Sequence, residues 1–277
     1  MNDTLRFTIL GCGSSPGTPR IGGYWGACDP NNPKNRRRRC SLAVERISDK
    51  GITTVVVDTG PDFREQMLDA NIAKLDGVLY THGHADHVHG IDDLRGFAII
   101  HRERINVYAD KFTAKRLHQG FEYCFKSPNP KMYPPILAAN IIEPYQPVTI
   151  EGAGGPITAL PILQQHGPIQ SLGFRFDCGA NADVCYSSDI SDLDDTAVVQ
   201  LGGLDTWIVD ALQYKPHVSH FSLEQSLEWI EKIKPRRAIL THMHIPLDYD
   251  KVQSETPNHV SPAHDGLSFT LELDNSQ

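Results

Sequence analysis

Four side chains that can bind metal ions lie close together in residues 81–87 (THGHADH). They have the spacing HxHxDH and are His82, His84, Asp86 and His87. In an extended segment His82 and His84 point to the same side, because side chains alternate along such a chain. Asp86 and His87 then turn toward a second point nearby. Since a tetrahedral metal takes about four ligands, the cluster is suited to begin two metal sites but completes neither.

Three later residues lie where a predicted strand passes into a loop, and they are candidates to complete the two sites. His166 follows the strand 157–163, Asp189 follows residues 185–188, and His242 follows residues 238–240. One assignment places His82, His84 and His166 on the first metal, Asp86, His87 and His242 on the second, and Asp189 between the two metals. Two divalent ions about 3.5–4 Å apart can share a hydroxide and hold the oxygens of a displacement reaction.

Both groups of residues could instead have ordinary structural roles without a metal ion. The cluster at 82–87 could be a histidine-rich surface loop, but four such side chains directly after a buried strand would repel one another when protonated. That spacing therefore favours metal binding. For His166, Asp189 and His242, turn capping stays open as an alternative. Donors of this type accept zinc, manganese or iron according to supply, so the ligands do not choose the metal.

The elements that must position these residues are predicted strands alternating with helices. Strand patterns fall at 6–11, 41–47, 53–58, 76–80, 105–108, 157–163, 171–176, 182–187, 205–210 and 237–240, and helical patterns at 61–70, 90–100, 110–120 and 222–233. The last helix has Ser222 at its cap and Gln225 three residues on. Residues 126–156 are rich in Pro and Gly and are predicted to form a surface excursion. The pattern predicts two packed sheets with outer helices, in one domain spanning residues 1–277.

Composition sets the remaining limits. The chain has 277 residues, 40% hydrophobic and 22% charged, which excludes wholesale disorder. The net charge of −8 argues against a general nucleic-acid coat protein. No apolar run approaches the roughly 20 residues of a membrane span, and the first residues lack a secretory signal. The six cysteines are scattered, which is typical of free thiols in a reducing cytoplasm, and we therefore expect a cytoplasmic protein.

The motif HGHADH, the strand VVVDTG and the later SSD and LTH segments resemble the metallo-β-lactamase superfamily. This resemblance covers nearly the whole chain. It implies an α+β fold, the αββα sandwich of two packed mixed β-sheets flanked by helices, with a dinuclear site at one edge. It also implies that His166, Asp189 and His242 are ligands. The segments ILGCGSSPGTPR, GGYWGACDPNNPKNRRRRCS and VVVDTGPDFREQML are similar to the PhnP-like cyclic phosphodiesterase branch, which is related to tRNase Z and PqqB.

Two further residues are assigned roles beside the metals. Asp58 ends a buried strand and is expected to orient a ligand histidine, with turn capping before Thr59 as an equal alternative. His220 matches the position of a non-ligand histidine in the phosphodiesterase branch, where it is placed to act on the scissile phosphate or the leaving group. Its alternative is a residue that merely precedes the helix cap Ser222. We take His220 and the ligand Asp86 as the catalytic residues.

The sequence departs from that branch in its long N-terminal loop. PhnP-like proteins commonly carry a CxCxxC cluster there, which forms a structural zinc site with a histidine after the LTH motif. Here Cys28 stands alone and His244 follows His242 closely, so we do not expect that zinc, although Cys28 and His244 could meet as a remnant or His244 could contact substrate. The run 36–39 (RRRR) is interpreted mainly as a solvated charged turn in which one arginine can pair with a carboxylate, with phosphate binding by one or two arginines as the alternative. Arg95 is a second candidate for substrate contact.

These observations predict a phosphodiesterase with two divalent metal ions, zinc or manganese. Metal-bound hydroxide would attack phosphorus while His220 assists the leaving group. The expected substrate is a small cyclic phosphate or nucleotide-type diester, with no membrane partner; nucleic acid is disfavoured, and a homodimer is the default assembly. One alternative is a tRNase Z-like nuclease, although the 126–156 segment carries only Lys126 and Lys131. A second is a non-hydrolytic accessory protein like PqqB, which the complete ligand set disfavours.

Overall fold

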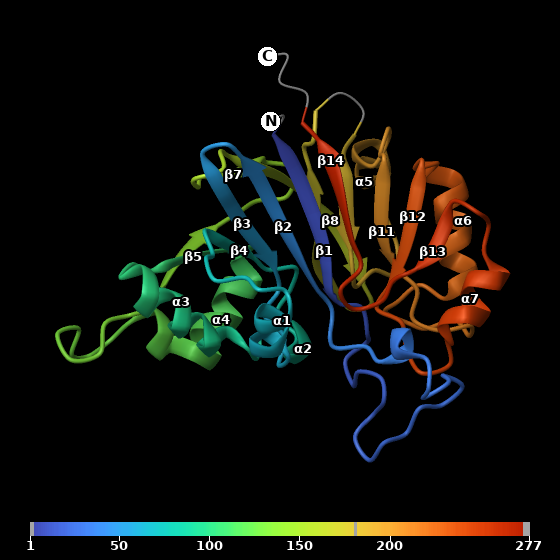
Figure 1. Ribbon diagram of the computed structural model, residues 1–277, viewed down its shortest axis with the longest axis horizontal. Helices are drawn as coiled ribbons and strands as arrows, with labels where there is room; N and C mark the ends of the chain where they lie inside the picture. The colour runs from blue at the N-terminus through green and yellow to red at the C-terminus, as the bar shows by residue number, and fades with distance from the viewer. Residues whose placement is uncertain (1–2, 180–181, 274–277) are drawn as a thin grey trace.

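The computed structural model describes residues 3–179 and 182–273, in which two seven-stranded β-sheets pack face to face with helices on both outer faces (Figure 1). In order across the first sheet the strands are β14 (Ser268–Glu272), β1 (Thr4–Gly11), β2 (Ser41–Ser48), β3 (Gly51–Val57), β4 (Gly77–Leu79), β5 (Ile105–Ala109) and β6 (Leu137–Ile141). In order across the second they are β13 (Val260–Pro262), β12 (Arg237–Thr241), β11 (Thr206–Asp210), β10 (Val184–Ser187), β9 (Ile169–Phe176), β8 (Ile157–His166) and β7 (Val148–Ile150). Both sheets are mixed, because β3 to β6 and β10 to β13 pair in parallel while the other neighbours pair antiparallel. The predicted αββα sandwich is confirmed.

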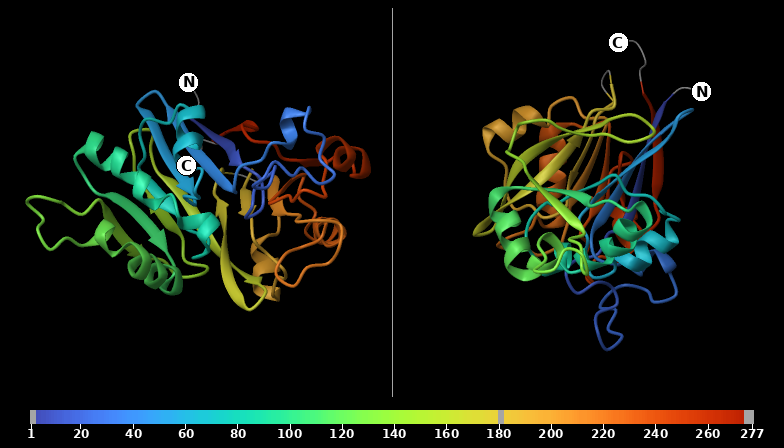
Figure 2. Two further views of the ribbon diagram at one scale, coloured as in Figure 1. Left: turned by 90° about the horizontal axis from the view of Figure 1, so that it is seen from below. Right: turned by 90° about the vertical axis from the view of Figure 1, so that its left-hand side faces the viewer.

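The helices divide between the two outer faces (Figures 1 and 2). Those beside the first sheet are α1 (Phe63–Asp69), α2 (Ala85–Val88), α3 (Leu94–His101) and α4 (Lys111–Phe125). Those beside the second are α5 (Asp195–Gln200), α6 (Leu223–Ile233) and α7 (Tyr249–Glu255). Short 3-10 turns occupy Pro33–Asn35 and Ile91–Asp93. Helix α6 begins as its sequence predicts, because Ser222 and Gln225 form a reciprocal capping box.

Two hydrophobic cores hold these layers together. The larger lies between the sheets, where Phe7 meets Phe176 edge to face at 5.8 Å, and it extends around Trp207 to helices α5, α6 and α7. The smaller lies between the first sheet and its helices, around Phe63 and Tyr80. Strand β3 is buried on both faces over its last five residues, because it contributes to both cores, and this explains why it ends in three consecutive valines. The cores therefore fix the strand ends that carry the candidate site.

The prediction for residues 126–156 was wrong in part. This segment contains β6 and β7, which complete the far edges of the two sheets. Both are short, and in β6 only Leu137 is buried while the next four side chains are partly or fully exposed, so neither shows a strong hydrophobic run. Only the loop before β6 projects, at the left of Figure 1. Within the described residues, no helix combines the length and the apolar character that crossing a membrane requires.

Candidate metal centre

The candidate ligands come from both sheets and meet at one edge of the sandwich. His82 and His84 follow β4, and Asp86 and His87 lie on α2 directly after them. The second sheet supplies the other three: His166 is the last residue of β8, Asp189 follows β10, and His242 follows β12. Neighbouring parallel strands end at the same edge, so residues far apart in sequence converge there.

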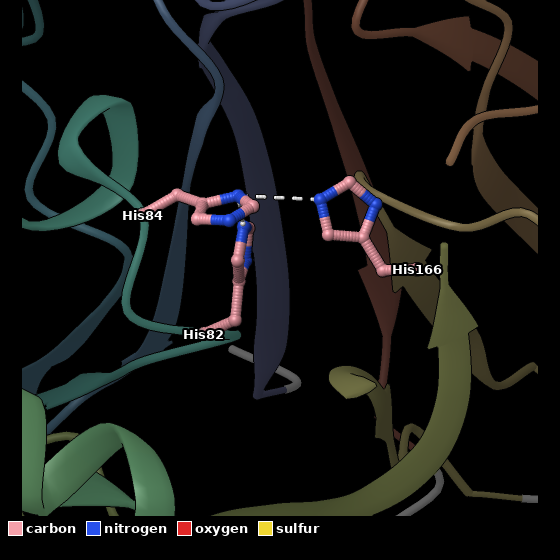
Figure 3. A group of neighbouring side chains, drawn as sticks. All are labelled: His82, His84 and His166. Carbon is pink, nitrogen blue, oxygen red and sulfur yellow. Dashed lines mark hydrogen bonds between the residues drawn. The ribbon is translucent and has the colours of Figure 1, made fainter. Parts of the chain in front are cut away.

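The first group of donors comprises His82, His84 and His166, shown in Figure 3. The Nε2 atom of His82 lies 2.9 Å from Nδ1 of His84, and Nε2 of His166 lies 3.3 Å from the same atom. His82 and His166 are buried, whereas His84 is exposed. Three imidazole nitrogens therefore point to one small region from opposite sides of the site.

The second group of donors comprises Asp86, His87, Asp189 and His242, whose ligand atoms all lie within 4.8 Å of one another. Asp189 also reaches the first group. Its Oδ2 atom lies 3.7 Å from Nε2 of His166 and 3.5 Å from Nε2 of His242, and its Oδ1 atom lies 3.1 Å from Nε2 of His87. A single carboxylate thus stands between the two groups, in the position that the sequence assigns to a bridging ligand.

Hydrogen bonds behind the ligands fix which nitrogen faces the site. Nδ1 of His87 lies 2.7 Å from the carboxylate of Asp58, and Nδ1 of His166 lies 2.7 Å from the carbonyl oxygen of Ser219. Because these oxygens only accept, both Nδ1 atoms carry the proton and leave Nε2 free to bind a metal. Asp58 also accepts from the backbone and hydroxyl of Thr81. The structure therefore gives Asp58 the orienting contact that its place at the end of β3 suggests.

Asp210 is a further buried carboxylate at the site, and the sequence interpretation missed it. It is the last residue of β11, where its Oδ2 atom lies 2.7 Å from Nδ1 of His220 and its Oδ1 atom lies 3.7 Å from Nδ1 of His242. The signal available was its position, since it ends an apolar strand (TWIVD) as Asp58 follows another (TTVVV). Burial, with Asp189 acting in the same direction, raises the pKa of Asp210 well above its ordinary value, and His242 acts in the opposite direction.

The donor groups fit divalent metal ions. Among the buried side-chain atoms without a hydrogen-bond partner are Nε2 of His87, Oδ1 of Asp189, and both ring nitrogens of His242. Buried polar atoms are rarely left unpaired, so unpaired donors that converge on one point indicate an ion. Burial also lowers the pKa of His82, and it lowers that of His166 to about 4. These imidazoles are therefore neutral at neutral pH, as metal binding requires.

Charge in the second group is balanced among its own members. Burial opposes protonation of His87, but Asp189, Asp86 and Asp58 outweigh it and raise the pKa of that ring. Conversely, burial opposes ionisation of Asp189, but His242 and His87 hold its pKa well below the ordinary value. The carboxylates are thus ionised, and a bound cation would replace the proton that otherwise balances them.

His220 lies at the edge of the ligand cluster. Its ring stacks on that of His242 with centroids 4.5 Å apart, and its Nε2 atom lies 4.0 Å from Oδ2 of Asp189. Burial lowers the pKa of His220, although Asp189 and Asp86 act in the opposite direction. With Nδ1 bonded to Asp210, the Nε2 atom faces the site and is available to exchange a proton.

The arginine run forms the solvated turn that its sequence suggests only in part. Arg36 is exposed, but Arg37 is only 2% exposed, which corrects the interpretation for that residue. Its guanidinium donates to the carbonyl oxygens of Leu247, at 2.7 Å, and His244, at 3.5 Å. A guanidinium can satisfy several carbonyl groups at once, so it links the N-terminal loop to the loop that follows β12. A lone buried arginine has no sequence signal that distinguishes it from its exposed neighbours.

The other two arginines of the run form ion pairs. Arg38 contacts Asp69 at 2.8 Å and Asp265 at 3.1 Å, and Arg39 contacts Asp62 at 3.0 Å. Arg39 also lines a cavity of about 510 Å³ beside the second donor group. Arg39 therefore lines the same cavity as Asp86, a member of the second donor group.

Cys28 and His244 contact different partners. The Sγ atom of Cys28 lies 3.4 Å from the carbonyl oxygens of Ile245 and Leu247. The His244 ring instead contacts the hydroxyl of Ser14 at 2.6 Å and the guanidinium of Arg20. Burial, together with Arg20, lowers the pKa of His244 to about 4. The guanidinium of Arg37, 3.9 Å from Cys28, fills the space on one side of the thiol.

Arg95 lies away from the candidate ligands. Its Nη2 atom contacts Asp92 at 2.6 Å, and the residue lines an apolar groove between α1 and α3. No candidate ligand lines that groove. The sequence placed Arg95 close to the metal motif, but α3 turns its side chain toward the outer face of the helical layer.

Two sheets packed in this order, with His and Asp donors at one edge, define the metallo-β-lactamase fold, which is shared by a superfamily of metal-dependent hydrolases. The sequence model of the β-lactamase superfamily domain matches residues 53–243. The crystal structure of a diphosphatase from the PhnP family is similar with a TM-score of 0.85 and 32% identity, over 98% of each chain. This chain therefore belongs to the β-lactamase superfamily and, within it, to the PhnP family.

More distant structures share the fold. Zinc-bound PqqB from Methylobacterium extorquens has a TM-score of 0.74 and 16% identity, over 95% of this chain and 99% of that one. The short form of human tRNase Z has a TM-score of 0.60 and 17% identity, over 95% and 98%. An octanoyltransferase of Porphyromonas gingivalis is 31% identical over 271 residues, which are 97% of this chain and 52% of that protein. The chain thus spans about half the length of this curated relative.

Proposed function

We propose that this protein is a metal-dependent phosphohydrolase that cleaves a phosphodiester or diphosphate bond in a small molecule. The observation that carries the proposal is the pair of donor groups joined by Asp189, which offers places for two cations next to His220. Similarity to a PhnP-family diphosphatase over the whole chain supports phosphorus chemistry. When bound, divalent ions supply positive charge for phosphate oxygens and make a water molecule more acidic.

The residues of the site would bind the ions, orient one another and donate a proton. His82, His84 and His166 would hold one ion, and Asp86, His87 and His242 would hold the other, with Asp189 shared. Asp58 keeps His87 oriented, and Asp210 fixes the proton of His220 on Nδ1. As water adds to phosphorus and gives up a proton to solvent, the bond to the leaving oxygen breaks. The doubly protonated ring of His220 donates its Nε2 proton to that oxygen and later regains one from solvent. Asp210 stabilises the protonated ring that makes this donation.

Small substrates are favoured over RNA. The projecting loop before β6 carries only Lys126 and Lys131, too little positive charge for a phosphate backbone that requires several contacts. A tRNase Z-like nuclease is therefore the second candidate function. An accessory protein without hydrolytic activity is disfavoured because the donor set is complete and His220 is held by a buried carboxylate.

Acyl transfer, the reaction named for the Porphyromonas gingivalis relative, is not what we propose for this chain. That relative is about twice as long, so the part of it that this chain does not match is available for such a reaction. Covalent acyl transfer requires an accessible nucleophile, often a thiol. All six cysteines here are buried, and burial raises the pKa of the thiols at Cys40, Cys124 and Cys185.

Hydrolysis of bis(p-nitrophenyl) phosphate tests the proposal. The purified protein should release p-nitrophenolate, lose this activity on treatment with a chelator, and recover it when manganese or zinc is restored. Asp189→Ala should lose bound metal and activity together, because it removes the shared ligand. A metal-loaded protein that turns over neither this diester nor any nucleoside diphosphate would refute the proposal and favour the accessory role.

A further inference from the structure

A cavity of about 840 Å³ opens beside the first donor group. Its walls carry charged, aromatic and amide side chains that binding of a simple diester would not require. One wall is the loop that carries His82 and His84, and another is the first part of α4. The rest comes from the turn between β8 and β9. This volume exceeds the space that a small cyclic phosphate fills, so most of it faces a part of the substrate that does not react.

Arg116 supplies the positive charge of this cavity. It lies on α4, and its side chain packs so closely on Gly83 that a Cβ atom there would lie 2.9 Å from the Arg116 Cγ atom. Gly83 separates the two ligands His82 and His84, so the arginine lies against the metal-binding loop itself. Among the residues that the structure describes, no carboxylate forms an ion pair with Arg116.

Its unpaired state distinguishes Arg116 from the other arginines near the site. Arg39 is paired with Asp62, and Arg20 contacts His244. Asp110, the carboxylate in the same cavity, already accepts a hydrogen bond from the backbone of Thr113 at the start of α4. In a chain with a net charge of −8, an unpaired guanidinium beside a metal centre is suited to bind an anionic group of the ligand.

An apolar surface lies across the same cavity. Phe112, one turn before Arg116 on α4, is 79% exposed, and Ile169, in the turn between β8 and β9, is 38% exposed. Pro168, Gln165 and Gln170 line the same cavity. An exposed aromatic ring in one cavity with apolar and amide groups is suited to a flat, polar-edged ring such as a nucleobase.

We propose that this cavity binds the nucleoside part of a nucleotide substrate and a phosphoryl group other than the one attacked. Arg116 holds that phosphoryl group, and Phe112 stacks on the base. The inference rests on the proposed function only in taking the reacting phosphorus to lie at the metal centre. It narrows the substrate class to nucleotides with at least two linked phosphoryl groups.

Calorimetric binding of three probes to the metal-loaded protein tests the two contacts separately. The probes are α,β-methylene-ADP, which has two phosphoryl groups and resists cleavage between them, AMP, and ribose 5-phosphate. Wild-type protein should bind α,β-methylene-ADP more tightly than AMP, and AMP more tightly than ribose 5-phosphate. Arg116→Ala should weaken α,β-methylene-ADP about 10- to 100-fold and AMP much less, because it removes a charge-assisted contact to the second phosphoryl group.

Phe112→Ala should weaken AMP about 5- to 50-fold and leave ribose 5-phosphate unchanged, because only AMP has a base to stack. Lys115→Ala and Tyr123→Ala are the matched controls. They remove an exposed cation and an exposed ring from the same helix, outside this cavity, and should leave all three affinities unchanged.

The outcomes separate this proposal from the hydrolase itself. The subsite would be overturned if the ratios of the affinities for the three probes stay at the wild-type values in Arg116→Ala and Phe112→Ala. It would also be overturned if no probe binds, even if bis(p-nitrophenyl) phosphate is hydrolysed. The predicted changes in binding, in a protein that hydrolyses no phosphate ester, would uphold the subsite and refute the hydrolase.

Discussion

At the scale of single residues, one buried carboxylate serves two histidines with different tasks. Asp210 lies 2.7 Å from Nδ1 of His220 and 3.7 Å from Nδ1 of His242. His242 has an unpaired Nε2 atom directed to the second donor group, which is the environment of a ligand. His220 lies farther from Asp189 and closer to the open edge. In our proposal, the same support therefore fixes both a metal ligand and a proton donor.

Replacing His220 by alanine tests that division. The variant should keep both metals, and its kcat on an alkyl phosphodiester should fall about 10²- to 10⁴-fold, because the alkoxide leaves without a proton. On bis(p-nitrophenyl) phosphate the loss should be much smaller, since p-nitrophenolate is a stable anion. Metal analysis and kcat for both substrates provide the measurement. Equal losses on the two substrates, or loss of one metal, would make His220 a ligand instead.

The sequence was a good guide to donors whose spacing is itself chemical. The HxHxDH run predicted a cluster because four ligand-type residues rarely crowd after a buried strand for any other reason. Asp210 lies in no such spacing of ligand-type residues, and a single aspartate at the end of a strand is common at turns, so the sequence did not single it out. Arg116 and Phe112 were missed for a different reason. They belong to an ordinary amphipathic helix, and only the close approach of α4 to Gly83 brings them to the site.

At the scale of elements, the long N-terminal loop is fastened by a buried guanidinium. Arg37 donates to carbonyl oxygens of the loop that follows His242, and its backbone pairs with that of Thr18. The guanidinium of Arg37 also donates a hydrogen bond to the side-chain oxygen of Asn35, which is buried as well. A charged group this deeply buried is stable only while its hydrogen bonds are made, so the two loops are held as a unit.

Arg37→Met should lower the free energy of unfolding by about 2–4 kcal/mol, because it leaves buried carbonyl groups without a donor. Arg36→Ala is the control, since it removes an exposed charge one residue away and should change stability by less than about 0.5 kcal/mol. Urea unfolding of the three proteins provides the comparison. If Arg37→Met were as stable as Arg36→Ala, the guanidinium would have no part in holding the loops.

Strand prediction succeeded where burial was continuous and failed at the sheet edges. Strand β11 is buried throughout and β3 over its last five residues, and both were recognised, as was α6 with its capping box. The edge strands β6 and β7 were assigned to a surface excursion, because an edge strand buries only part of its side chains and its pattern is diluted by nearby Pro and Gly. What places them is pairing with neighbours far along the chain, which local sequence does not record.

At the scale of the whole molecule, the candidate centre exists only because two sheets pack against each other. The first sheet leads into His82, His84, Asp86 and His87, and the second leads into His166, Asp189 and His242. The apolar layer between the sheets, which includes Phe7 and Phe176, sets the separation of these two sets. Asp189 from the second sheet contacts donors from both, so it joins the two halves of the fold as well as the two donor groups.

Electron paramagnetic resonance of the protein loaded with two equivalents of Mn²⁺ tests this central claim most directly. Two ions about 3.5–4 Å apart that share Asp189 should give the multiline spectrum of an exchange-coupled pair. Asp189→Asn should weaken or abolish that coupling. Saturation at one ion per chain, or two independent six-line spectra in the wild-type protein, would contradict a dinuclear centre.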